Sequence, residues 1–92
     1  MPRAKTLKYH LYADPKHAWL KVSSKTIKQL DLQDQISSHS YITGSFLFLE
    51  EDIDMPLFIQ AWENKVGCQF PPIETHIADG KSWIRNYPKY IN

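Results

Sequence analysis

The sequence predicts an α+β fold: an antiparallel sheet of four to six strands, with one long helix on one face and one short helix. Several short segments alternate apolar and polar residues with a period of two, as half-buried strands do. One segment has instead the 3.6-residue period of an amphipathic helix. Turn residues separate the segments at short intervals, which is typical of antiparallel sheets. The length predicts a single domain over residues 1–92.

The first predicted unit is a hairpin over residues 5–22. Leu7 and Leu11 share one face of its first strand, because alternate side chains of a strand point the same way. Asp14 and Pro15 follow, a pair that favours a turn. The alternation then resumes and supplies the returning strand.

A short helix is predicted next, over about residues 23–31, followed by a second hairpin. Two consecutive serines at the start of the helix are suitable N-caps, and apolar residues recur three positions apart within it. The hairpin has predicted strands at about 36–42 and 45–51, joined by a turn at Thr43-Gly44.

The long helix is predicted over about residues 54–66. Its apolar positions have helical spacing and are Met55, Phe58, Trp62 and Val66. Asp54 is a suitable N-cap, and Gly67 suits the C-terminal stop. These signals together define both ends of the helix.

A further strand is predicted at residues 73–77, where Ile and polar residues alternate. Pro71 and Pro72 precede it, and proline within a strand is confined to an edge or to the start. The segment after residue 80 is predicted to be a last short strand or an extended tail.

Four carboxylates crowd the junction between the second hairpin and the long helix: Glu50, Glu51, Asp52 and Asp54. A calcium loop is excluded because the segment lacks the central glycine and the closing glutamate. In one interpretation Asp52 and Asp54 satisfy the N-terminus of the helix, and the two glutamates end the strand at the surface. In the other, the glutamates form an acidic patch that faces a partner.

Charge is segregated along the chain although the net charge is only +1. Residues 1–28 carry +6, residues 29–63 carry −7 and residues 64–92 carry +2. Such asymmetry indicates charged partners unless folding mixes the charges.

Catalytic, metal and cofactor motifs are missing from the sequence. The four histidines form neither H-E-x-x-H nor a Cys/His cluster, and Cys68 is the only cysteine. Three glycines, none in a G-x-G array, exclude the usual phosphate-binding loops. We therefore predict no catalytic residue, no metal site, no cofactor and no enzymatic activity, and a small enzyme is the least favoured alternative.

Basic and aromatic residues alternate near the C-terminus, as in surfaces that bind single-stranded nucleic acid or protein. The residues predicted to contact a partner, together with the two glutamates above, are Trp83, Arg85, Tyr87 and Lys89. In the alternative interpretation the tail aromatics pack on the core. The residues predicted to meet nucleic-acid phosphates are Lys16, Lys21, Lys25 and Lys28.

Most of the chain resembles a group of small proteins carried by bacteriophages and mobile elements. The resemblance lies in "DPKHAWLKV", "ISSHSY", "FLEEDID" and "IRNY". The sequence departs from the pattern at Phe48, where the group has tyrosine. It also resembles phage anti-CRISPR proteins of the type I-F class.

This resemblance implies a non-enzymatic inhibitor in the host bacterial cytoplasm. Its partners would be subunits of the guide-RNA surveillance (Csy) complex and the guide RNA, and it would block pairing of target DNA with the guide. No small-molecule substrate is expected. No membrane partner is expected either, since no apolar run approaches the roughly 20 residues of a membrane span. The alternative is a small phage regulatory protein that binds nucleic acid.

Overall fold

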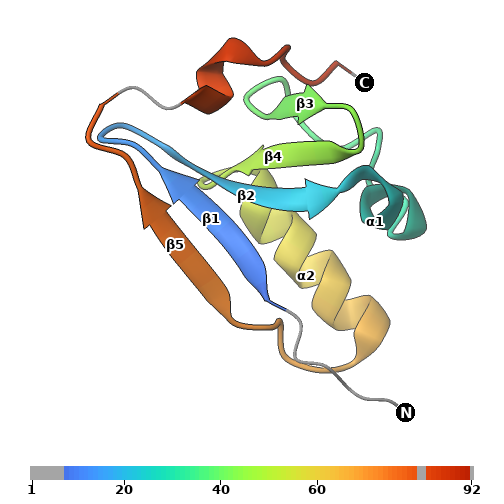
Figure 1. The fold of residues 1–92 in the computed structure, drawn as a ribbon. Coiled ribbons are helices and arrows are strands. Elements are labelled where there is room, and N and C mark those ends of the chain that lie inside the picture. Colours follow the sequence, from blue (N-terminus) through green and yellow to red (C-terminus); the bar gives the residue numbers. More distant parts are fainter. Residues whose placement is uncertain (1–7, 81–82, 92) are drawn as a thin grey trace.

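The computed structural model describes residues 8–80 and 83–91 (Figure 1). It is an α+β fold built on a five-stranded sheet with the strand order β3-β4-β2-β1-β5. The strands are β1 (Tyr9–Ala13), β2 (Ala18–Ser23), β3 (Tyr41–Thr43), β4 (Phe46–Glu50) and β5 (Ile73–Ile77). The helices are α1 (Ser24–Gln29), α2 (Asp54–Val66) and the 3-10 helix η1 (Trp83–Asn86).

The sheet is mixed, so the prediction of an antiparallel sheet is wrong for one pair of strands. β5 runs parallel to β1, whereas the three other pairings are antiparallel. The reason is α2, which crosses one face of the sheet and carries the chain back before β5 begins (Figure 1). A helical crossover of this kind is the usual connection between parallel strands.

One face of the sheet packs against α2 and forms the main core. Leu20 and Leu49 lie directly opposite each other on β2 and β4 and are fully buried, as is Phe58 of α2. Burial of each such side chain stabilises the fold by about 1.5–3 kcal/mol. The long helix therefore covers one face, as predicted.

The opposite face is partly covered by residues 83–91. Ile84 of η1 is fully buried against Trp19, Tyr41 and Phe48. In place of the predicted strand or extended tail, the segment forms η1 and then an isolated bridge between Lys89 and Tyr41. Residues 83–91 thus form a second, smaller layer, and the sheet lies between this layer and α2.

The helix boundaries follow local signals in the sequence. α2 has the predicted bounds and ends at Gly67, whose φ of 82° is the left-handed conformation that glycine adopts without strain. α1 is shorter than predicted and is capped by the hydroxyl of Ser23. It ends in a Schellman motif, because Leu32 N–H donates to the carbonyl of Ile27 and Asp31 has a φ of 59°.

Some predicted strands were too long, although β5 has the predicted bounds. Of the predicted strand 36–42, only β3 is extended, because the residues before it form turns that bind Asp54. Of the first predicted strand, residues 5–7 lie outside the described residues. β5 is an edge strand that begins directly after Pro72, as the prolines predict.

Candidate functional site

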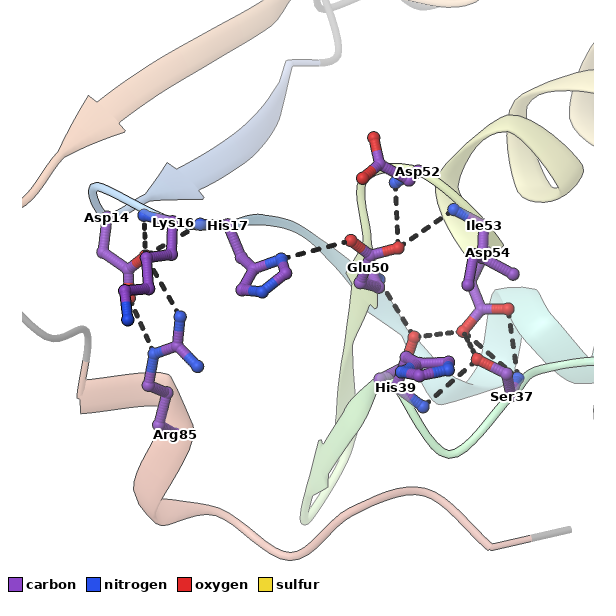
Figure 2. Close-up of polar contacts among 11 residues, drawn as sticks. Asp14, Lys16, His17, Ser37, His39, Glu50, Asp52, Ile53, Asp54 and Arg85 are labelled. Atoms are coloured by element: carbon purple, nitrogen blue, oxygen red, sulfur yellow. Dashed lines mark hydrogen bonds and ion pairs between the residues drawn. The ribbon is translucent and has the colours of Figure 1, made fainter.

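The turn between β1 and β2 is held by Asp14, whose side chain is only 2% exposed. Its Oδ1 accepts hydrogen bonds from the backbone N–H groups of Lys16 (3.0 Å) and His17 (2.9 Å), an Asx turn. Both carboxylate oxygens also bind Arg85: Nε donates to Oδ2 at 2.8 Å and Nη2 to Oδ1 at 3.2 Å (Figure 2). This bidentate pair fixes the position of the guanidinium.

Arg85 lies over the ring of Trp19. Its Cζ is 4.9 Å from the ring centroid, within the range of a cation–π contact. The hydrogen bond to Asp14 raises the pKa of the guanidinium above its usual value, so Arg85 stays charged at any physiological pH. Trp19 is buried, and its indole N–H has no hydrogen-bond partner among the described residues. The buried ring of Trp19 therefore supports the guanidinium of Arg85 from one side.

Arg85 also separates two shallow depressions of about 340 and 280 Å³. The larger is lined by Lys16 and the smaller by His17 and Lys89. Lys16 and Lys89 are exposed on either side of Arg85. The structure therefore brings three predicted site residues from distant parts of the sequence to one surface.

The aromatic residues of the tail divide between core and surface. Tyr87 stacks on Phe48 with ring centroids 5.6 Å apart and planes 16° from parallel. Trp83 packs edge-on against Phe48 and Tyr12 and is nevertheless 49% exposed. Tyr87 therefore packs on the core, as the alternative interpretation predicts, whereas about half of Trp83 stays exposed. We call Lys16, Arg85 and Lys89 the Arg85 surface.

Glu50 is buried at the end of β4, although the sequence placed it at the surface. It is 6% exposed, and its Oε1 accepts hydrogen bonds from the backbone N–H groups of Asp52 (2.9 Å) and Ile53 (3.0 Å). Its Oε2 lies 3.6 Å from Nδ1 of His17. Glu50 therefore holds the turn that leads into α2. The sequence assigned a different task, satisfying the helix N-terminus, to Asp52 and Asp54. Glu51, by contrast, is exposed.

Asp54 is not the N-cap of α2, because Ile53 occupies that position without a capping side chain. Instead, Asp54 is fully buried and accepts hydrogen bonds from the N–H and hydroxyl of Ser37 and from the hydroxyl of Ser40 (Figure 2). The Ser40 oxygen in turn accepts the backbone N–H of Glu50 at 2.9 Å. The carboxylate ties the segment before β3 to the start of α2.

The four lysines predicted to bind phosphate do not form one surface. Lys16 belongs to the Arg85 surface, and the ammonium of Lys21 lies 4.2 Å from the ring centroid of Phe46. Lys25 and Lys28 lie on α1, at the far end of β2 from Lys16. Only Lys16 is placed beside the predicted partner residues.

A second polar cluster lies on the parallel strand pair and was not predicted. His10 of β1 and Glu74 and His76 of β5 place one donor atom each within 4.8 Å of one another. The sequence offered no signal for it, because His10 and His76 are 66 positions apart and the parallel pairing was not foreseen.

No protein-family model, no curated protein and no solved structure matches this chain. Within residues 8–80 and 83–91, none of the helices has the length and apolar character needed to span a membrane.

Proposed function

We propose that this protein is a non-enzymatic inhibitor that binds the type I-F guide-RNA surveillance (Csy) complex in the host bacterial cytoplasm and blocks the pairing of target DNA. The class of target comes from the sequence resemblance described above. The Arg85 surface is the observation that supports a binding role, and the chemistry of that surface suggests how the protein would bind.

The Arg85 surface suits an anionic partner such as an RNA backbone or an acidic protein loop. Asp14 uses Nε and Nη2 of Arg85, so Nη1 takes no part in that ion pair. Lys16 and Lys89 flank the guanidinium, and Trp83 adds an exposed ring for stacking. Because Asp14 and Trp19 hold the arginine in place, little conformational entropy is lost on binding.

Acidic residues next to this surface suit a composite target of protein and RNA. Asp52 lines the same depression as Arg85 and Lys89, and Glu51 beside it is exposed. Lysines in a groove built for nucleic acid would meet these carboxylates, whereas exposed guide RNA would meet the cations. Surfaces of both signs favour one docking orientation over others.

Co-elution with a purified type I-F surveillance complex tests this proposal. We expect a stoichiometric complex on size exclusion and loss of target-DNA binding when the inhibitor is added before the DNA. Absence of co-elution together with undiminished DNA binding would refute it.

Charge reversal tests the Arg85 surface. The double variant Lys16→Glu and Lys89→Glu should weaken binding at least 100-fold, because each replacement turns an attraction into a repulsion. Lys25→Glu with Lys65→Glu is the matched control, since both lysines are exposed on the helices and the change in net charge is the same. Equal losses in the two double variants would mean that net charge, not this surface, determines binding.

A nucleic-acid-binding regulatory protein is the second candidate, because exposed lysines and the exposed ring of Trp83 also suit a single strand. Affinity for free DNA or RNA should then fall steeply with salt concentration. No binding at low salt would exclude this candidate without affecting the first.

A further inference from the structure

The parallel pairing of β1 and β5 aligns three potential metal ligands on one face of the sheet. In the register, His10 lies opposite Glu74, and Tyr12 lies opposite His76. Glu74 and His76 are two positions apart on one strand, so their side chains point to the same face. This is the face opposite α2, in a part that η1 leaves open, because His76 and Glu74 have side chains that are 40% and 47% exposed.

The two imidazoles already have the spacing of metal ligands. Nδ1 of His10 lies 3.0 Å from Nε2 of His76. With zinc–nitrogen bonds of about 2.0–2.1 Å, two ligands lie about 3.3 Å apart at a tetrahedral ion and about 2.9 Å apart at a right angle. The nitrogen–nitrogen distance therefore needs to change by only a few tenths of an ångström. Both rings must also rotate, because a bound ion lies off the line along which the hydrogen bond now points.

The carboxylate of Glu74 is close enough to be the third ligand. Its Oε2 lies 3.8 Å from Nε2 of His76, and its Oε1 accepts a hydrogen bond from Lys8 at 3.3 Å. Because Lys8 binds Oε1, Oε2 is left to face His76. A partner that orients a ligand in this way is typical of protein metal sites.

The ring of His76 is held by stacking on Tyr12, with centroids 4.9 Å apart and planes 17° from parallel. Tyr12 is in turn flanked by Trp83 and Phe48. The ligand on the edge strand is therefore positioned by neighbouring aromatic rings.

We propose that His10, Glu74 and His76 form a site for a divalent late transition-metal ion such as Zn²⁺, with its remaining coordination positions open to water or to a ligand. Two imidazoles and one carboxylate are a donor set that suits zinc, copper, nickel and iron. The site is independent of the proposed inhibitor function. A bound ion would link the edge strand β5 to β1 and so stabilise the fold.

Calorimetric titration of the untagged protein with ZnCl₂ tests this site. We expect one ion per chain, and a thermal midpoint that rises by about 10–20 °C at a hundredfold excess over the dissociation constant. NMR spectra should show the largest shifts at the imidazoles of His10 and His76. Absence of binding at about 1 mM Zn²⁺, or shifts spread equally over all four histidines, would overturn the proposal.

Ligand variants provide the matched comparison. His10→Ala and Glu74→Gln should each weaken zinc binding at least tenfold, because two ligands hold the ion far less well than three. His39→Ala, at an exposed histidine outside the cluster, should leave the affinity unchanged. Equal affinity in His10→Ala and the wild type would refute the site. Because Glu74 is half exposed, Glu74→Gln should not disturb folding. This variant therefore tests the site even if His10→Ala does not fold.

Discussion

The buried carboxylate of Asp54 gives the sharpest test of the structure. Asp54→Asn keeps the size of the side chain and removes its charge. The native carboxylate accepts hydrogen bonds from the N–H of Ser37 at 3.0 and 3.1 Å, from its hydroxyl at 2.8 Å and from the hydroxyl of Ser40. The amide of asparagine retains one acceptor oxygen and presents an NH₂ group to the remaining donors.

The magnitude follows from the number and kind of these bonds. A hydrogen bond to a charged group contributes about 1.5–3 kcal/mol, and a buried donor without a partner costs about 1–3 kcal/mol. The hydroxyls can rotate to other acceptors, but the N–H of Ser37 cannot. Asp54→Asn should therefore lower the free energy of unfolding by about 1.5–3 kcal/mol. Asp54→Ala should lower it by about 3–5 kcal/mol, a large part of the 5–15 kcal/mol typical of a domain.

Urea denaturation measures this effect. With a slope of about 1 kcal/mol per molar, expected for so small a domain, the midpoint of Asp54→Asn should fall by about 1.5–3 M. Asp52→Asn is the control, because Asp52 is exposed and only two positions away. It should change the free energy of unfolding by less than about 0.5 kcal/mol. If the urea midpoints of Asp54→Asn and Asp52→Asn lie within about 0.3 M of each other, the role assigned to Asp54 is refuted. This threshold is about the precision of such fits.

Three further outcomes are expected. Asp31→Gly should raise the free energy of unfolding by about 0.5–1 kcal/mol in urea denaturation, because the φ of 59° strains a residue with a Cβ; a decrease would contradict the Schellman motif. Glu50→Gln should lower it by about 1–2 kcal/mol, because the hydrogen bonds to the turn before α2 lose their charge; an effect no larger than that of Glu51→Gln would refute this. Burial raises the pKa of Tyr9 above 10.0, outweighing a hydrogen bond with Trp62, so its contribution to stability is complete below pH 10 and is lost as the pH rises through the folded-state value. Tyr9→Phe should therefore reduce the loss of stability in alkaline denaturation, and an unchanged alkaline profile would contradict it.

The elements that the sequence predicted best carry complete local signals. The bounds of α2 followed from helical spacing and a terminal glycine, and the edge position of β5 followed from two prolines. Each of these features acts within a few residues of the element that it defines.

The roles of the carboxylates could not be assigned in the same way. An aspartate just before a helix has the sequence pattern of an N-cap whether its side chain turns back to the helix or into the core. The serines that bind Asp54 are 14 and 17 positions away, so only the fold brings them together. Glu50 holds the turn because it ends a strand directly beside it.

Strand direction was the other non-local feature. Hydrophobic alternation identifies a strand but not its neighbour, and the register of β1 with β5 depends on the crossover by α2. The grouping of His10 with His76 depends on that register. The pairing of Arg85 with Asp14 was equally hidden, because 71 positions separate the two residues.

The place of β5 beside β1 means that a nascent chain cannot complete the sheet until β5 has left the ribosome. A nascent chain that has emerged as far as Gly67 can form β1 to β4 and both α-helices, but the outer edge of β1 still lacks its neighbour. Trp19 and Phe48 also lack the layer that η1 provides. Until β5 and η1 have left the ribosome, the chain carries an open strand edge and uncovered aromatic rings, features that promote aggregation and recruit chaperones.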